Sequence, residues 1–183
     1  MALTKEGLFS CGINRFGKLG LGSYNYEQRI YSFTKINLQN VITVECGGNH
    51  SLALTTNGLY ACGSAIAIRP FANTELSSFQ KGDIQNIVSF KCGHDFSLIL
   101  THKGLYGCGK NNFGQLGYIN KDSYSYSKEF IKIDIDNVLS FDCGKFHSII
   151  ETTEGFFGCG SNHKGQLGID NYNKSKNKLV KIM

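Results

Sequence analysis

The feature that most constrains this chain is an internal repeat with a period of about 50 residues. Every one of the seven cysteines in the 183-residue sequence is followed by glycine. The Cys-Gly pairs fall into two interleaved series, one spaced by 51, 46 and 51 residues and the other by 46 and 51. The first series is Cys11, Cys62, Cys108 and Cys159, and the second is Cys46, Cys92 and Cys143. A recurring period of this length indicates an array in which each repeat adds one structural unit.

The sequence around the cysteines repeats as well, in three blocks. The first block reads Thr-x-x-Gly, two large apolar residues, one variable residue and Cys-Gly. The second reads Asn-x-x-Gly-[Lys/Gln]-Leu-Gly, and the third joins an apolar run to Cys-Gly-x-x-[His/Phe]-Ser. The blocks begin at Thr4, Thr55, Thr101 and Thr152, at Asn14, Asn111 and Asn162, and at Asn40, Asn86 and Asn137. The second repeat has residues 64–71 in place of the Asn-x-x-Gly block, so we expect its loop to differ.

The blocks predict four strands in each repeat. The first strand is β-branched or aromatic, as buried strands are, and the second and third flank a tight turn. In that turn Asn57-Gly58, Lys103-Gly104 and Glu154-Gly155 put glycine where a hairpin needs positive φ. The first strands are predicted at residues 41–44, 87–90 and 138–141, and the second at 51–55, 97–101 and 148–152. The third strand covers 59–62 and its copies, and a variable fourth strand covers 33–38, 130–135 and 179–183.

Four short strands in about 50 residues, with no sustained helical period, are typical of a propeller blade. We therefore predict an all-β chain, a β-propeller fragment of about four blades with four antiparallel strands each. The whole chain forms one repeat array on this interpretation. Its approximate repeats are residues 1–40, 41–86, 87–137 and 138–183.

Composition excludes several classes of protein. Charged residues make up only 18% of the sequence, which excludes a long charged coiled coil. Apolar residues make up 41%, enough for a packed core, and no apolar run is long enough to cross a membrane. The first eleven residues include Lys5 and Glu6 and no apolar segment, so no signal peptide is predicted. The net charge of +5 comes from scattered lysines and fits a solvated surface.

The cysteines predict neither a metal site nor a disulfide framework. A zinc site needs close ligand pairs, and the sequence has no Cys-x-x-Cys pair. A disulfide framework usually has an even number of cysteines, and seven is odd. We predict instead that all seven thiols are reduced and buried at one repeated strand position, with no metal and no cofactor. Reduced thiols indicate the nucleus or the cytoplasm.

No catalytic motif stands out from the repeat. The sequence has no G-x-S-x-G, no H-E-x-x-H and no Walker loop. Residues 107–109 and 158–160 begin like a G-x-G-x-x-G fingerprint, but the strand repeat already explains their glycines. His50 and His147 share a repeat position that Phe96 occupies in between, which indicates packing and a bond to a neighbouring blade's backbone. We therefore predict that the chain is not an enzyme.

The combined pattern resembles the RCC1 repeat, named after the regulator of chromosome condensation. The resemblance rests on three Asn-x-x-Gly-[Lys/Gln]-Leu-Gly blocks in phase with three Cys-Gly-x-x-[His/Phe]-Ser blocks, and it covers nearly the whole chain. It implies a β-propeller, typically of seven blades. Members act as protein-interaction platforms, as nucleotide exchange factors for the small GTPase Ran, or as chromatin-binding modules. This chain departs from them in having cysteine where many have tryptophan, and about half the repeats of a full ring.

The resemblance also implies roles for individual residues. In Ran exchange factors the loop after Cys-Gly faces the GTPase, so Asp95 and His94 are candidate partner-facing residues, with an ordinary solvated aspartate as the alternative. The candidates for a weak contact with chromatin are four lysines near the end of the sequence, Lys174, Lys176, Lys178 and Lys181. The repeat positions with an expected structural role are Gly12, Gly47, Gly63, Gly93, Gly109, Gly144, Gly160, His50 and His147. We expect a protein-interaction platform, with exchange on a Ran-type GTPase as the alternative.

Half a ring would leave its first and last blades uncovered. Leu8 and Phe9 would be exposed at one end, and Phe156 and Phe157 at the other. Such apolar faces recruit partners or cause aggregation. We therefore expect the isolated chain to self-associate or to be only marginally stable, with a symmetric dimer as the ordered form. The alternatives are an open half-ring within a longer propeller and a closed ring of four blades.

Overall fold

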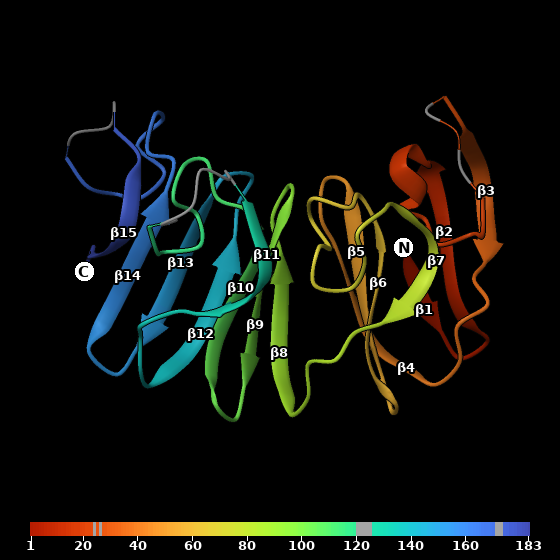
Figure 1. The fold of residues 1–183 in the computed structure, drawn as a ribbon, viewed down its shortest axis with the longest axis horizontal. Coiled ribbons are helices and arrows are strands. Elements are labelled where there is room, and N and C mark those ends of the chain that lie inside the picture. The colour runs from red at the N-terminus through yellow and green to blue at the C-terminus, as the bar shows by residue number, and fades with distance from the viewer. Residues whose placement is uncertain (24, 26, 120–125, 171–173) are drawn as a thin grey trace.

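The computed structural model describes residues 1–23, 25, 27–119, 126–170 and 174–183. In this part of the chain fifteen strands and one 3-10 turn, η1 (Arg15–Gly17), are present. The strands form three four-stranded sheets and one three-stranded sheet, and all strand pairs are antiparallel. The sheets stand side by side in chain order, like the blades of a fan (Figure 1). The predicted all-β propeller fold of about four blades is therefore confirmed.

Each blade is a simple meander in which consecutive strands are neighbours. The first blade comprises β1 (Ala2–Thr4), β2 (Gly7–Ile13) and β3 (Arg29–Lys35). The second comprises β4 (Val41–Cys46), β5 (His50–Thr55), β6 (Gly58–Gly63) and β7 (Leu76–Lys81). The third comprises β8 (Ile87–Cys92), β9 (Phe96–Thr101), β10 (Gly104–Lys110) and β11 (Tyr126–Lys132). The fourth comprises β12 (Val138–Cys143), β13 (His147–Thr152), β14 (Gly155–Gly160) and β15 (Lys176–Lys181).

The fourth strands differ from the prediction in position and number. They begin three or four residues earlier than expected, and the second blade also has one, β7, where none was predicted. The cause is an irregularity in the pairing of the third and fourth strands, which shifts the register at Cys108 and its copies. Pairing resumes beyond it, so that polar residues such as Ser127 and Tyr126 join the sheet opposite Gly109 and Lys110. An apolar pattern does not reveal such residues.

The hydrophobic core is divided into three layers, each lying between two adjacent blades. Between the first and second blades the layer contains Leu8, Ile36, Ala53, Cys62 and Phe79. The next two layers are larger and are built around Leu59, Phe90 and Ile99, and around Leu98, Leu116, Ile133 and Ile150. Leu8 is fully buried in the first layer, so the prediction that it lies on an open face is wrong. Its place in the layer follows from alternation along β2, in which successive side chains point to opposite faces.

The repeated glycines occupy three kinds of position at which a side chain would collide with a neighbour or would need a strained backbone. An added Cβ at Gly47, Gly93 or Gly144 would collide with the ring of the histidine or phenylalanine three residues later. At Gly63, Gly109 and Gly160 the backbone has positive φ, and an added Cβ would collide with backbone atoms at the start of the preceding strand. The hairpin glycines Gly58, Gly104 and Gly155 have φ of 125°, 119° and 117°, as the turn pattern predicts.

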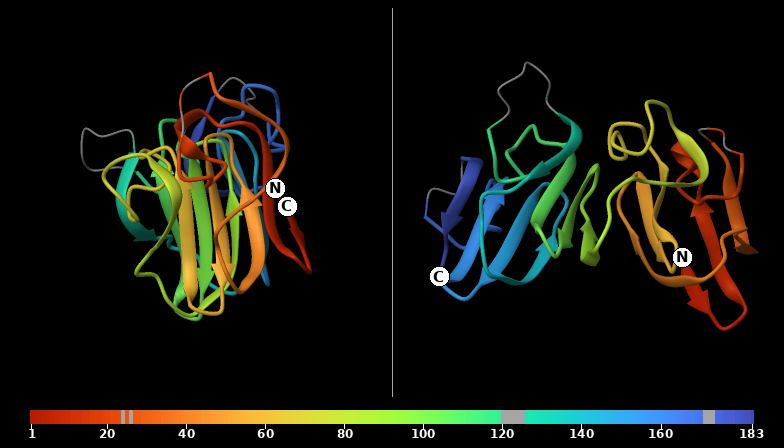
Figure 2. Two further views of the ribbon diagram at one scale, coloured as in Figure 1. Left: turned by 90° about the vertical axis from the view of Figure 1, so that its right-hand side faces the viewer. Right: turned by 60° about the horizontal axis from the view of Figure 1, so that its bottom comes forward.

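The Asn-x-x-Gly loops each close around one buried asparagine. Asn14 accepts a hydrogen bond at Oδ1 from the backbone N–H of Leu19 (3.0 Å), and its Nδ2 donates to the Ser23 carbonyl (2.7 Å). Asn111 and Asn162 make the equivalent bonds in their own loops. Their loops connect the third and fourth strands at one end of the blades, which we call the loop face. The tight hairpins between the second and third strands lie at the opposite end, the hairpin face (Figures 1 and 2).

Adjacent blades are joined by hydrogen bonds from side chains of one blade to the loop of the preceding one. The Lys18 carbonyl accepts bonds from Ser51 Oγ (2.9 Å) and Cys62 Sγ (3.4 Å). The Gln115 carbonyl accepts the same pair of bonds from Ser148 and Cys159. This pair of hydrogen bonds occurs between the first and second blades and between the third and fourth. Packing of adjacent blades therefore accounts for the presence of serine and cysteine at these repeat positions.

Candidate functional site

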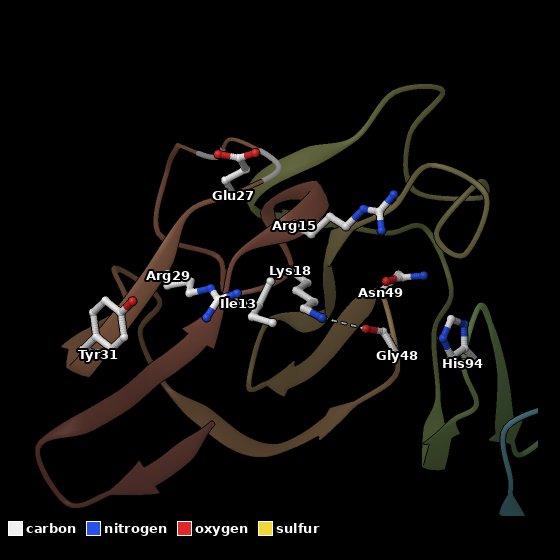
Figure 3. A pocket seen from close by; sticks show the side chains of 9 residues that line it. All are labelled: Ile13, Arg15, Lys18, Glu27, Arg29, Tyr31, Gly48, Asn49 and His94. Atoms are coloured by element: carbon white, nitrogen blue, oxygen red, sulfur yellow. Dashed lines mark hydrogen bonds between the residues drawn. The ribbon is translucent and has the colours of Figure 1, made fainter.

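A cavity of about 840 Å³ opens where the first blade meets the loops of the second and third (Figure 3). Sequence positions far apart contribute to it. The first blade supplies the end of β2, the turn η1 and the start of β3, and the other two blades supply the loops that follow β4 and β8. Its lining residues are Ile13, Arg15, Lys18, Glu27, Arg29, Tyr31, Gly48, Asn49 and His94.

The charged lining is predominantly basic. Arg15, Lys18 and Arg29 place three basic side chains around the cavity, and Glu27 supplies one carboxylate (Figure 3). The Arg15 guanidinium also lies 4.9 Å from the centre of the Phe16 ring. An excess of positive charge in a recess of this kind raises the local concentration of anions.

Lys18 differs from the residues at the same position in the other loops. Gln115 and Gln166 turn back on their own loops, where each Oε1 accepts a backbone N–H, from Phe113 (3.0 Å) and Lys164 (2.8 Å). The Lys18 side chain instead crosses to the second blade, where its Nζ donates to the Gly48 carbonyl at 2.9 Å. Burial lowers the pKa of Lys18, and the nearby Arg15 charge lowers it further. The lysine is therefore held in a position where a positive charge is disfavoured.

Asp95 lies behind the cavity wall. Its Oδ1 accepts a hydrogen bond from Asn49 Nδ2 (2.8 Å), and its Oδ2 is 2.9 Å from His94 Nδ1. The Asp95 side chain is only 12% exposed. Burial acts to raise the pKa of Asp95, but the hydrogen bonds from Asn49 and His94 outweigh it, and the pKa is lowered. The carboxylate thus holds together two residues of the cavity wall, one from each of two blades.

A row of rings runs from the cavity across the loop face. The His94 and Phe146 rings are 5.7 Å apart, Phe146 and Phe113 are 5.1 Å apart, and Phe113 and His163 are 6.1 Å apart. These four residues, which we call the aromatic row, come from loops of the third and fourth blades. Lys145 Nζ lies 5.0 Å from the centre of the Phe146 ring. The row provides a partly apolar surface beside the basic cavity.

The two repeated histidines do not line the cavity, although His50 lies beside His94 and Asp95. His50 is fully buried, and its Nε2 is 2.7 Å from Ser97 Oγ in the next blade. The partner at Nε2 is therefore a side-chain hydroxyl of the neighbouring blade, and the backbone of His94 in the same blade also acts on the His50 ring. His147 is half-buried, and burial lowers the pKa of both histidines.

The prediction that all seven cysteines are buried is wrong. All seven are free of disulfides, but only three of them are buried, namely Cys62, Cys108 and Cys159. Cys46 is exposed, and the other three are partly buried. Cys92 and Cys143 lie 3.8 Å from backbone carbonyls of the first strand of the preceding blade. Cys46 has no such neighbour, because the described first blade has no strand in that position.

The lysines proposed for chromatin do not gather at one place. Lys176 begins β15 at the loop face, and Lys181 ends it at the hairpin face. Lys178 lies between them and Lys174 precedes the strand, so the four are distributed along an outer edge. Among the described residues no three His, Cys, Asp or Glu side chains are grouped to hold a metal ion. No helix in this part of the chain is long and apolar enough to span a membrane.

From the sequence we named His94, which lines the cavity, and Asp95, which lies behind its wall, but we did not name the cations of the lining. Arg15, Lys18 and Arg29 are on the first repeat, far from residue 94 in the sequence. One signal was available, namely that lysine stands at position 18 where the other two loops have Gln115 and Gln166. A single charged residue at a repeat position that is otherwise neutral indicates a role specific to that repeat.

Comparison with known protein families matches two parts of the chain. Residues 5–54 and residues 87–115 each match a family model described as "Regulator of chromosome condensation (RCC1) repeat". Over 60 residues the chain is 45% identical to the E3 ubiquitin-protein ligase HERC2 of Homo sapiens, a match that covers 32% of this chain and 1% of that protein. A 60-residue match to the X-linked retinitis pigmentosa GTPase regulator of Canis lupus familiaris has 32% identity and covers 32% of this chain and 6% of that protein. The chain therefore spans a small part of these relatives.

Solved structures with the same arrangement of blades are also known. Prp20p of Saccharomyces cerevisiae superposes with a TM-score of 0.84 at 20% identity, over 99% of this chain and 47% of that chain. Human WBSCR16 superposes with a TM-score of 0.78 at 22% identity, over 94% of this chain and 51% of that chain. At such identities the likeness shows the fold. The chain spans about half the length of these two structures.

Proposed function

Because this chain carries RCC1 repeats and folds as part of a β-propeller, we propose that it is a protein-interaction module whose loop face contacts a protein partner. The observation that carries this proposal is the joining of a basic cavity to the aromatic row on that face. Aromatic and arginine side chains are enriched in protein interfaces. The free thiols fit a reducing compartment such as the nucleus or the cytoplasm.

The variation among the repeats supports the loop face over the hairpin face. The three hairpins of the complete blades are built alike, each with a threonine whose hydroxyl bonds to the carbonyl of the following glycine at 3.1 Å. The loops differ, since residues 64–72 form a turn of another kind and Lys18 replaces glutamine in the first loop. Variable loops on a regular framework are where binding function usually resides.

Nucleotide exchange on a Ran-type GTPase is the second candidate. The Prp20p structure is described together with the binding of that protein to Gsp1p and histones, and its fold is similar to this one. In this chain, however, both oxygens of Asp95 are engaged by Asn49 and His94. A carboxylate so occupied is poorly placed to compete for the phosphate-binding groups of a GTPase, so we favour the interaction module.

A site-specific photo-cross-linker distinguishes the two faces. Benzoylphenylalanine would replace either Asn112 or Lys103, which are both exposed and lie at opposite ends of β10. After irradiation in cell extract, we expect the chain with the cross-linker at position 112 to gain a discrete protein adduct, and the chain modified at position 103 to gain none. Adducts of equal yield from both positions, or from position 103 alone, would contradict the proposal.

Release of a fluorescent guanine nucleotide from purified Ran separates the second candidate from the first. We expect the chain to leave the release rate unchanged, and Asp95→Ala to behave in the same way. A marked acceleration that Asp95→Ala abolishes would establish exchange activity and would make the loop face a GTPase-binding surface.

A further inference from the structure

We propose that the basic cavity binds an oxyanion, a carboxylate or a phosphate, carried by an extended peptide segment of the protein partner. The inference rests on the proposed function, because it names the chemistry that the loop face would recognise. The anion would lie among Arg15, Lys18 and Arg29 (Figure 3). The rest of the segment would follow the aromatic row toward the fourth blade.

The charge and size of the cavity suit such a group. Three cations and one carboxylate line it, which leaves an excess of positive charge for an anionic ligand to neutralise. The volume of about 840 Å³ is within the range of small-ligand pockets and exceeds what one carboxylate or phosphate needs. Arginine and lysine together form charge-assisted hydrogen bonds that are about twice as strong as neutral ones.

Lys18 gives the strongest support for an anion. Its Nζ has one described hydrogen bond, to the Gly48 carbonyl, although an ammonium group has three protons to donate. Burial and the Arg15 charge both lower the pKa of Lys18, so these surroundings disfavour its charged form. An anion within reach would offset both effects. The neutral glutamines at positions 115 and 166 show that the loop itself does not require a cation here.

One carboxylate, Asp95, lies behind the opposite wall, and both of its oxygens are occupied by Asn49 and His94. Its side chain is only 12% exposed, but its charge still acts on Lys18, whose pKa it raises. Counting Glu27 as well, three cations stand against two carboxylates, so positive charge remains in excess. Asp95 also fixes His94, the residue at which the cavity meets the aromatic row.

The row itself favours a peptide over a nucleic acid. Single-stranded nucleic acids bind when bases stack on open ring faces. Here Phe113 and Phe146 pack on one another at 42°, His94 and Phe146 at 43°, and Lys145 covers a face of Phe146. The faces are thus largely occupied by neighbouring groups, while ring edges remain for apolar side chains to contact. An acidic residue followed by apolar residues matches this surface.

Fluorescence anisotropy with labelled peptides tests the inference on the intact chain. The probes are hexaglutamate, a phosphoserine hexapeptide, neutral hexaglutamine and a short single-stranded DNA. We expect at least one of the two acidic peptides to bind while hexaglutamine does not, and the tighter of the two identifies carboxylate or phosphate as the source. Lys18→Gln, which installs the residue of the other loops, should weaken binding by about tenfold.

Two further variants keep the result interpretable. Arg29→Gln changes an exposed cavity residue on β3 and should also weaken binding, and Lys103→Gln, a matched charge loss on the hairpin face, should leave it within about twofold. Failure of both acidic peptides to bind, or an equal loss in Lys103→Gln, would overturn the inference. Tighter binding of DNA with the same dependence on Lys18 would replace the peptide by a nucleic acid. A cross-link from position 112 that persists without acidic-peptide binding would overturn this inference alone.

Discussion

A single buried histidine links the second and third blades. His50 is fully buried and 2.7 Å from Ser97 Oγ, and burial lowers its pKa to about 4. The pKa in the unfolded chain is about 6.5. Below pH 6.5 the unfolded chain therefore takes up a proton that the folded chain does not. Stability is fully present above this pH and is lost as the pH falls toward 4.

We predict that replacing His50 by phenylalanine reduces this pH dependence. Phe96 occupies the same repeat position and is fully buried, so the ring has a precedent in the fold. Between pH 7 and pH 4 the unmodified chain should lose about 3 kcal/mol of unfolding free energy through His50. Urea unfolding across this range measures the loss, and part of it will remain in the variant because the pKa of His147 is also lowered. An identical pH profile in both proteins would contradict the assignment.

The thiols give a second prediction at the scale of single residues. Cys46 is exposed, whereas Cys62, Cys108 and Cys159 are buried, and burial raises the pKa of these three thiols. A thiol reagent needs an accessible thiolate. We expect Cys46 to be labelled first in the native chain and the three buried thiols to be labelled only in denaturant. Mass spectrometry of timed labelling measures this order, and a fast phase that survives Cys46→Ser would disprove it.

At the scale of the β element, the glycine that ends the third strand is a point of close backbone approach. At Gly160 an added Cβ would meet the Phe146 carbonyl and would lie 2.6 Å from His147 Cα. At Gly12, the copy in the first blade, nothing lies within 4 Å. Both have positive φ, of 98° and 111°. Substitution at Gly12 therefore measures the free energy lost to backbone strain alone, and substitution at Gly160 adds the free energy lost to collision.

We predict that Gly160→Ala destabilises the chain more than Gly12→Ala. Alanine at positive φ costs about 1–2 kcal/mol at either site. At Gly160 the collision with backbone adds about 1–3 kcal/mol, because the start of β13 cannot move without disturbing its pairing with β14. Denaturant unfolding of the two variants measures the difference. Equal losses of stability would show that close approach does not matter at this position.

For the whole molecule, the two outermost blades each have a side that no other described blade covers. At the first blade Phe9 lines an open groove of about 520 Å³ with Phe33, which is 59% exposed, and Leu3 is 40% exposed. At the fourth blade Phe156 is 36% exposed. Both outer blades thus carry uncovered apolar side chains, although Leu8 is not among them. Others lie on the first strands of the second, third and fourth blades, namely Ile42, Val88 and Leu139.

We predict that the isolated chain self-associates through the uncovered sides of its two outermost blades. Apolar surface left uncovered by a neighbouring blade favours association, and a symmetric dimer is the simplest closed form. Size exclusion with light scattering should show a mass that rises with concentration toward that of a dimer. Phe33→Ser at the first blade should shift the equilibrium toward the monomer, whereas Lys103→Ser on the hairpin face should not. A monomer at all concentrations would contradict the prediction.

The blades, their strands and their turns were predictable from sequence because each depends on residues close together in the chain. Alternating apolar residues, turn glycines and the 46- and 51-residue spacings act locally, and they recur often enough to be recognised. The fourth strands were misplaced because a bulge carries polar residues such as Ser127 into the sheet. The exposure of Cys46 was missed because it depends on a neighbouring strand and not on the residues around it.

The sequence by itself determined the repeat, the β class of the fold and the positions where only glycine fits the hairpins. The tertiary structure alone decided which side chains of different repeats meet. Lys18, Gly48 and His94 belong to three blades and become neighbours because each blade places its loops on the same face. The pattern within one repeat carries no information on the charge that the next repeat presents to it. For that physical reason the basic cavity became visible only when the blades were packed side by side.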